Sequence, residues 1–224
     1  MLTQSFTPSV GKAALRGTDF FSLSPGSAGL IATEFRYRKE EEIFGQDEPS
    51  EYVYQVVSGA VRSHKLLSDG RRQIGAFYLP GDVFGLEVGA THRLTAEAVI
   101  DTTVRLLHRG SLERAAAADV EIARSLWSIT AKELCHAESH LLLLGRKSAL
   151  ERVANFLLEM DRRLAHAGLM YLPMCRRDIG DYLGLTLETV SRSVSELHKQ
   201  GIVGLPSARQ IQVVNRAKLR GLDA

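Results

Sequence analysis

The chain has 224 residues, of which 45% are hydrophobic and 24% are charged, with 28 basic residues against 26 acidic ones. This composition is typical of a globular protein with one or two domains; it argues against a disordered chain, and the two cysteines are too few for a disulfide-stapled miniprotein. The longest purely aliphatic run, residues 141–144, is far shorter than the ~20 residues that span a bilayer, and the N-terminus lacks an apolar signal core. We therefore expect a cytoplasmic protein that does not enter a membrane.

The N-terminal half predicts a β-domain behind a short arm. Residues 1–30 mix Ser, Thr, Gly and Pro without a period, which indicates a loosely held arm. In residues 31–118, short strand-like runs are separated by turn signals, among them Gly59, Gly70 and Gly81. Their spacing of eight to twelve residues predicts an all-β barrel or sandwich.

A long helix follows, from about Asp119 to Leu144, with a length of roughly 39 Å at 1.5 Å per residue. One apolar seam repeats at intervals of three and four residues, and it comprises Trp127, Thr130, Leu134, Ala137, Leu141 and Leu144. This spacing is typical of a two-stranded coiled coil, so we interpret the seam as a homodimer interface. The alternative is that the helix only packs on the β-domain, a contact that Ile122, Leu126 and Ile129 could make.

The end of this helix marks the predicted domain boundary. Gly145 interrupts the apolar run, so we expect the dimerisation segment to cover residues 119–145 and to end in a hinge. Ser148 and Glu151 then match an S-x-x-E capping box that begins a new helix. Residues 146–224 form the predicted C-terminal domain.

The C-terminal domain has the pattern of a winged helix-turn-helix. Ile179 and Leu183 share one face of a short helix, Gly184 permits a tight turn, and Thr186 can cap the next helix. The inward positions of that second helix are Val190, Val194 and Leu197. A strand pair within residues 202–214 then predicts the wing, and the fold class is therefore α+β.

The second helix would present four side chains near its exposed N-terminal half, namely Leu187, Glu188, Ser191 and Arg192. In a major groove, Arg can bond guanine bidentately, Glu can accept from a cytosine amino group, Ser can contact a base or a phosphate, and Leu can touch a thymine methyl. We expect Arg176 to contact a DNA phosphate, with Arg177 as a weaker candidate. The alternative is a two-helix packing motif that binds no DNA.

These segments resemble the Crp/Fnr family of transcription regulators. Its DNA-binding helices are similar to RDIGDYLGLTLETVSRSVSEL, in which Glu188, Ser191 and Arg192 match the Fnr-like E-x-x-S-R motif. Its β-roll is similar to YRKEEEIFGQDEPSEYVYQVVSGAVR and its glycine bend to LPGDVFGL, so the resemblance covers nearly everything from Phe35 onward. For residues 31–118 the resemblance implies an antiparallel, jelly-roll-like β-roll that would serve as a sensor-like domain. The match looks nearest to FixK-type regulators of low-oxygen and nitrogen-fixation genes. The resemblance implies a homodimeric activator that reads a TTGAT-like inverted repeat, with Arg192 and Glu188 specifying its G·C pair, and that recruits RNA polymerase.

The chain departs from this family at its effector sites. Cyclic-AMP receptors bind phosphate through Gly-Glu-Leu followed by Arg-Ser, whereas this chain has Gly85-Leu86-Glu87 and then Thr91-His92-Arg93-Leu94. Fnr itself holds an iron–sulfur cluster on N-terminal cysteines, and this N-terminus has none. We expect no cofactor and no small-molecule effector. The alternative is a regulator that depends on a cyclic nucleotide or another small ligand, and haem held without a covalent bond by a histidine also stays open.

Cys175 falls at the predicted N-terminus of the first helix of the helix-turn-helix, directly before Arg176 and Arg177. We call the two helices of this motif the reading head. A helix N-terminus and neighbouring guanidinium groups favour a thiolate, which is the form that oxidants attack. Our hypothesis is that oxidation of Cys175, or a link between the two Cys175 residues of a dimer, switches DNA binding off. The alternative is an inert helix cap.

A second chemical candidate lies on the long helix, where Cys135, His136 and His140 fall within one and a half turns. Two histidines at this spacing can bind zinc. The sequence HAESH nevertheless lacks the glutamate of the H-E-x-x-H motif, because Ala137 occupies that position. We therefore expect neither a metal site nor an enzyme.

Overall fold

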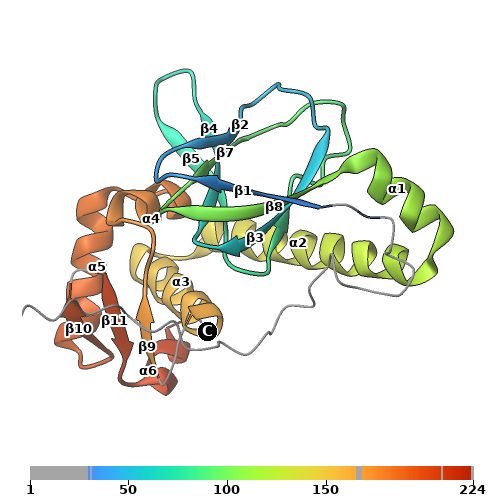
Figure 1. Cartoon of the computed structure of the whole chain (residues 1–224). Coiled ribbons are helices and arrows are strands. Elements are labelled where there is room, and N and C mark those ends of the chain that lie inside the picture. Colours follow the sequence, from blue (N-terminus) through green and yellow to red (C-terminus); the bar gives the residue numbers. More distant parts are fainter. Residues whose placement is uncertain (1–29, 31, 165–167, 208, 223–224) are drawn as a thin grey trace, which may run out of the picture.

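The computed structural model describes residue 30 and residues 32–164, 168–207 and 209–222. The predicted arm, residues 1–30, lies almost wholly outside these described residues. Figure 1 shows a β-domain beside a long helix, with a smaller helical domain packed below both. Within the described part of the chain, no helix is long and apolar enough to cross a bilayer. The predicted α+β fold class is confirmed.

The β-domain consists of two antiparallel four-stranded sheets. The first sheet, in the order β1-β8-β3-β6, contains β1 (Thr33–Tyr37), β8 (Thr102–His108), β3 (Tyr52–Ser58) and β6 (Val83–Phe84). The second sheet, in the order β2-β7-β4-β5, contains β2 (Glu42–Phe44), β7 (Thr95–Ala98), β4 (Val61–Leu66) and β5 (Arg72–Tyr78). Both sheets contribute to one apolar cluster, to which β3 supplies Tyr54 and Val56. Apolar residues therefore hold the two sheets together as the predicted β-roll.

The predicted turns at Gly59, Gly70 and Gly81 are confirmed, since all three have a positive φ. At Gly59 the close packing also excludes a side chain, because a Cβ there would lie 2.4 Å from Thr102 Oγ1. The turn between β3 and β4 is therefore fixed by both backbone conformation and space.

Two helices follow the β-roll. The sequence pattern did not predict α1 (Arg109–Ala118), a short helix in which only Leu112 is buried. Helix α2 (Val120–Arg146) begins at Asp119, whose carboxylate accepts a hydrogen bond from Glu121 N at 2.8 Å. Ile122 is buried against the β-roll together with Val53 of β3, and Leu126 and Ile129 are partly buried beside it. The predicted contact of this second apolar group with the β-domain is thus confirmed.

The predicted interruption at Gly145 is wrong. Helix α2 continues through Gly145 to Arg146, and the chain leaves the helix at Lys147, which is extended. A glycine costs about 1 kcal/mol in a helix, which lowers its stability but does not end it. Two neighbouring leucines hold the last turn in place, since Leu143 is buried and Leu144 is partly buried. The break between α2 and α3 therefore falls at residues 147–148.

The next helix, α3 (Ala149–Leu164), begins with the predicted capping box. Glu151 Oε2 accepts from Ser148 N at 2.6 Å, and Ser148 Oγ accepts from Glu151 N at 3.4 Å. Arg152, one residue later, donates to Leu144 O of α2 at 2.8 Å and to Leu183 O at 3.0 Å. A guanidinium thus binds carbonyls at the C-terminal ends of two helices, where positive charge is favourable.

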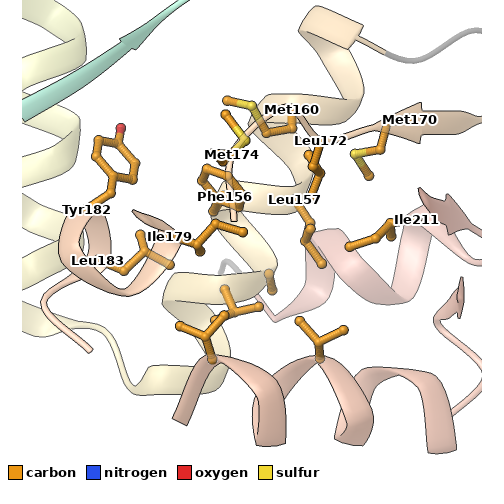
Figure 2. Packing of buried hydrophobic residues seen from close by; sticks show 14 of the residues in the cluster. Phe156, Leu157, Met160, Met170, Leu172, Met174, Ile179, Tyr182, Leu183 and Ile211 are labelled. Carbon is orange, nitrogen blue, oxygen red and sulfur yellow. The ribbon is translucent and has the colours of Figure 1, made fainter. Parts of the chain in front are cut away.

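The remaining elements form the predicted winged domain. They are β9 (Leu169–Tyr171), α4 (Arg176–Leu183), α5 (Leu187–Lys199), β10 (Val203–Ser207), β11 (Gln210–Val213) and α6 (Arg216–Gly221). Strands β10 and β11 make the wing, and β9 adds a third strand in the order β10-β11-β9. The pattern predicted neither β9 as a strand nor α6. Figure 2 shows the core of this domain, where Phe156, Met160 and Met174 lie close together.

Candidate nucleic-acid interface

Helices α4 and α5 form the predicted helix-turn-helix. Gly184 ends α4 in the left-handed conformation with φ +63°, as expected for the turn, and Thr186 Oγ1 accepts from Thr189 N at 3.2 Å to cap α5. A second glycine, Gly180, is also required at this turn, which the sequence pattern did not reveal. A Cβ at Gly180 would lie 2.6 Å from Leu185 O, so only glycine lets the turn pass this close to α4.

Helix α5 has a buried inner face and an exposed outer face. The inner face is formed by Val190, Ser193, Val194 and Leu197. The outer face of its first half presents the four predicted base-reading residues, which are all exposed: Leu187, Glu188, Ser191 and Arg192. The buried face packs against the rest of the domain, so the exposed face is free to enter a groove.

Charge on the exposed face is balanced between neighbours. Arg192 Nη2 donates to Thr189 Oγ1 at 3.3 Å, which directs the guanidinium back along the first turn of α5. The pKa of Glu188 is lowered, first by its own backbone amide and the Thr186 hydroxyl at the helix N-terminus, and then by Arg192 and Arg177. Glu188 is therefore ionised near neutral pH and available as a hydrogen-bond acceptor.

The two arginines at the start of α4 differ in exposure. Arg176 is partly buried, its Nη1 is enclosed without a hydrogen-bond partner among the described residues, and burial lowers its pKa. Arg177 is exposed. Arg177 is thus more exposed than Arg176, although the sequence favoured Arg176 as the phosphate contact.

Cys175 caps the N-terminus of α4, as expected. Its Sγ donates to Asp178 Oδ2 at 3.2 Å and accepts from Asp178 N at 3.5 Å, while Cys175 N donates to the same carboxylate at 3.3 Å. The residue is exposed. The partner of the thiol is therefore a carboxylate, and not the guanidinium groups that follow it in the sequence.

The predicted dimer seam lies along α2 and is largely uncovered in the single chain. Trp127, Leu134 and Leu141 are 77%, 60% and 71% exposed. Thr130 and Ala137 are also exposed, and only Leu144, at the end next to α4, is partly covered. Large apolar side chains exposed in one row indicate a protein interface.

Comparison with known proteins agrees with this geometry. A cyclic nucleotide-binding domain model matches residues 34–119, and a Crp-like helix-turn-helix domain model matches residues 151–222. The chain is 47% identical over 199 residues to the nitrogen fixation regulation protein FixK of Azorhizobium caulinodans, an alignment that covers 87% of this chain and 80% of that protein. The chain belongs to the Crp/Fnr family.

Two further relatives place this regulator in the FixK-like subgroup. It is 41% identical to FixK of Rhizobium meliloti, with 86% of this chain and 87% of that protein covered. The solved structure of FixK2 from Bradyrhizobium japonicum matches with a TM-score of 0.85 and 73% identity, covering 87% of this chain and 98% of that one. The resemblance inferred from the motifs is thus confirmed, and the chain is a FixK-like transcription regulator.

The loop that corresponds to the family's nucleotide clamp does not fit a cyclic nucleotide phosphate in this regulator. Arg93 is exposed, and its Nε donates to Glu87 Oε2 at 3.1 Å, so its charge is already paired. His92 is 1% exposed and stacks on Phe44, with ring centroids 3.6 Å apart. Burial lowers the pKa of His92, so it is neutral near pH 7. The loop therefore directs no unpaired cation inward to receive a phosphate.

The histidines that were considered as zinc ligands instead connect α2 to α4. His136 Nε2 lies 3.1 Å from the hydroxyl of Tyr182, and the ring of His140 stacks on Tyr182 with centroids 4.2 Å apart. His140 Nε2 is buried without a hydrogen-bond partner among the described residues. Burial and, after it, His136 lower the pKa of His140. This contact therefore favours neutral His140.

Because its folded-state pKa is lowered, His140 destabilises the fold as pH falls through its unfolded value of about 6.5 toward the folded value. We expect the urea midpoint to fall between about pH 7.5 and about pH 5.5, and to fall less in His140→Gln, which does not ionise. Burial also lowers the pKa of His64 and His92, so part of the slope should remain. Equal pH slopes for His140→Gln and the unchanged protein would contradict this role of His140.

Proposed function

We propose that this regulator binds DNA as a homodimer and reads a TTGAT-like inverted repeat with α5. The observation that carries the proposal is the exposed first half of α5, where four side chains with base-reading chemistry lie over a buried face. In this proposal Arg192 bonds the guanine, Glu188 accepts from its cytosine partner, Leu187 contacts a thymine methyl and Ser191 a base or phosphate. Two copies of α5 related by a twofold axis would lie about 34 Å apart, one duplex turn.

The homodimer forms through α2 in this proposal. The row of exposed apolar residues has the spacing of a coiled-coil seam, and a second α2 would cover it. A symmetric pair of reading helices requires a palindromic operator. Because the dimer acts on DNA, we place it in the cytoplasm.

Contacts to DNA phosphates complete the interface, and Arg177 is the first candidate. Arg176 is the second, and it would have to turn its guanidinium outward from its partly buried position. We expect Arg177→Ala to weaken binding to all sequences alike and to reduce the slope of log K against log salt by about 1, with a smaller change in slope for Arg176→Ala. Titrations at several salt concentrations measure this, and a larger slope change for Arg176→Ala would restore the ranking expected from the sequence.

The regulator acts without a small-molecule effector in this proposal, because the charge of Arg93 is paired and His92 is buried. The second candidate function is a sensor that needs a cyclic nucleotide or another small ligand, and the match of residues 34–119 to the cyclic nucleotide-binding model favours it. Calorimetry with cyclic AMP and cyclic GMP, together with DNA binding in the absence of ligand, separates the two. Binding to DNA only after addition of a nucleotide would support the sensor.

We also propose that oxidation of Cys175 switches DNA binding off. Two equivalents of hydrogen peroxide convert the thiol to a sulfinic acid and release two waters, which replaces the S–H donor by an anion beside the Asp178 carboxylate. Repulsion between the two anions would open the N-terminal cap of α4. We expect peroxide to lower operator affinity by about tenfold in the unchanged protein and to leave Cys175→Ser unaffected, with Cys135→Ser as the matched control. Equal peroxide sensitivity in Cys175→Ser would remove the switch.

The role in the cell follows from the relatives. Curated FixK proteins that match this chain carry the name nitrogen fixation regulation protein, and AadR of Rhodopseudomonas palustris carries the name transcriptional activatory protein. We propose that this regulator activates genes of nitrogen fixation and the low-oxygen response by recruiting RNA polymerase.

Selection from a random DNA pool tests the central proposal. The full chain is incubated without ligand at about 150 mM salt, and bound duplexes are sequenced. We expect enrichment of an inverted repeat with TTGAT-like halves one turn apart. A pool that stays random after several rounds would overturn the proposal.

A further inference from the structure

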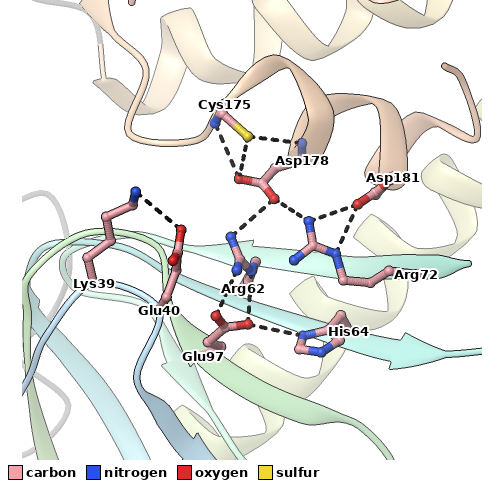
Figure 3. Close-up of polar contacts among 9 residues, drawn as sticks. All are labelled: Lys39, Glu40, Arg62, His64, Arg72, Glu97, Cys175, Asp178 and Asp181. Carbon is pink, nitrogen blue, oxygen red and sulfur yellow. Dashed lines mark hydrogen bonds and ion pairs between the residues drawn. The ribbon is translucent and has the colours of Figure 1, made fainter. Parts of the chain in front are cut away.

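A buried ion network joins the first reading-head helix to the β-roll. Arg62 of β4 binds Glu97 of β7 bidentately, with Nη2–Oε1 at 2.8 Å and Nε–Oε2 at 3.3 Å. Its remaining nitrogen, Nη1, donates to Asp178 Oδ1 of α4 at 3.1 Å. Figure 3 shows this guanidinium between the two carboxylates, with one on each domain. The bond between Arg62 and Asp178 thus joins residues that are 116 positions apart in the chain.

A second arginine, on the neighbouring strand β5, also connects the β-roll to α4. Arg72 of β5 donates through Nη2 to the same Asp178 Oδ1, and through Nε and Nη2 to Asp181 Oδ2 at 2.9 and 2.8 Å. The two acids lie three residues apart on α4, so they face the sheet together. Two arginines of the β-roll thus hold one side of α4 at two points.

The burial of this network makes its geometry specific. The side chains of Arg62 and Asp178 are only 7% and 4% exposed. Burial would raise the pKa of Asp178, but its hydrogen bond to Cys175 and the charges of Arg62 and Arg72 outweigh it and lower the pKa. Ionised groups this buried are stable only where their partners satisfy them, so rotation of α4 would leave charges unpaired.

Apolar packing alone would not fix the orientation of α4 on the β-roll. Ile74 and Phe77 of β5 join the same core cluster as Tyr182 of α4, and the rings of Phe77 and Tyr182 are 5.2 Å apart. Such contacts depend on buried area and tolerate small rotations, whereas bidentate ion pairs depend on angle.

The other side of α4 contacts the dimerisation helix. Tyr182 bonds His136 and stacks on His140, both on α2. Since α2 would lie along the twofold axis of the dimer, α4 is held between this axis and the β-roll. The position of α5 relative to the axis then follows, because the Gly184 turn joins it directly to α4.

We propose that Arg62 and Arg72 are positioning residues for operator recognition, which hold α4 so that the two copies of α5 match the half-site spacing. This inference rests on the proposed function of α5 in DNA binding. In this proposal neither arginine touches DNA. Arg62 acts through Asp178, and Arg72 acts through Asp178 and Asp181.

The experiment measures spacing preference. Full-chain Arg72→Gln, Arg72→Lys, Arg62→Gln and Asp181→Asn are titrated against the selected palindrome, against palindromes one base pair longer or shorter, and against a single half-site. Arg71→Gln is the matched control, because Arg71 has the same charge one residue away. Its side chain is 77% exposed and, among the described residues, bonds only Asp69 of its own turn. Thermal unfolding identifies any variant that is destabilised, and Asp181→Asn tests the network at its most exposed member, 24% exposed.

We expect Arg72→Gln and Asp181→Asn to lose about tenfold in affinity for the correct palindrome and less than about twofold for the half-site, with a weaker preference among spacings. Arg72→Lys should recover part of the loss, and Arg71→Gln should behave as the unchanged protein. Equal losses on half-site and palindrome, or an unchanged spacing preference in folded variants, would overturn the positioning role. If the unchanged protein itself shows no sequence or spacing preference, the proposed function fails instead.

Discussion

Replacement of Arg192 by Ala is expected to remove about 1–3 kcal/mol of discrimination at the guanine of each half-site. The guanidinium is exposed on the first half of α5, and its bond to the Thr189 hydroxyl leaves other donors free for guanine O6 and N7. Without it, the base pair at that position would be read by Glu188 alone. The affinity for the selected operator should therefore fall while the affinity for an operator with that pair changed stays nearly constant.

Competition binding measures this difference, with the two operators competing for the same protein at fixed salt. Lys199→Ala is the matched control, because it removes a positive charge seven residues further along the same helix. The control should weaken both operators equally or neither. Unchanged discrimination in Arg192→Ala would mean that another residue reads the guanine.

A charge in the α2 seam is expected to separate the dimer. Leu141→Asp would place a carboxylate in a row of exposed apolar side chains that a second chain covers in the proposed dimer. Each monomer would then hold one half-site, and the loss of two-site binding should lower affinity for the palindrome by about 10²-fold or more.

Light scattering and sedimentation measure the oligomeric state, and Trp127, the single tryptophan, reports on the seam by its fluorescence. Leu142→Asp is the matched control, since Leu142 is the same residue type and is 66% exposed, but lies beside the seam. We expect Leu141→Asp to be monomeric with a Trp127 emission shifted toward that of an exposed indole, and Leu142→Asp to remain dimeric. The opposite pattern would place the interface on another face of α2.

Local pattern was sufficient to predict the reading head. Gly184, the Thr186 cap and the inward positions of α5 are set by neighbours within a few residues, so their spacing in the sequence already specified the turn and the two faces. The exposed position of Arg192 followed from the same spacing. Gly180 was not recognised, because its requirement comes from the backbone of Leu185 across the turn.

Three elements, α1, β9 and α6, were missed, and one helix end was misplaced, where tertiary contacts outweigh local preference. Helix α1 buries only Leu112 and therefore has almost no periodic signal. Helix α2 passes through Gly145 because Leu143 is packed against the core and because Arg152 binds Leu144 O. Strand β9 is defined by its antiparallel pairing with β11, which a local sequence pattern does not reveal.

The network between the domains had no signal in the sequence at all. Arg62 and Asp178 are separated by 116 positions and belong to different domains. In a sequence pattern, an arginine or an aspartate is normally assigned to the protein surface. The same holds for Tyr182, because its partners His136 and His140 were considered only as zinc ligands on their own helix. Contacts of this kind depend on how the helices and strands pack in the tertiary structure.

Asp178 serves two structures with one carboxylate. Its Oδ2 closes the N-terminal cap at Cys175, and its Oδ1 receives both arginines of the β-roll. Fraying of the first turn of α4 would withdraw the anion from those arginines, and detachment of the sheet would leave the cap with an unneutralised charge. The two events therefore belong to one cooperative unit, and the amide hydrogens of this turn should exchange at the rate at which the whole reading head departs from the β-roll.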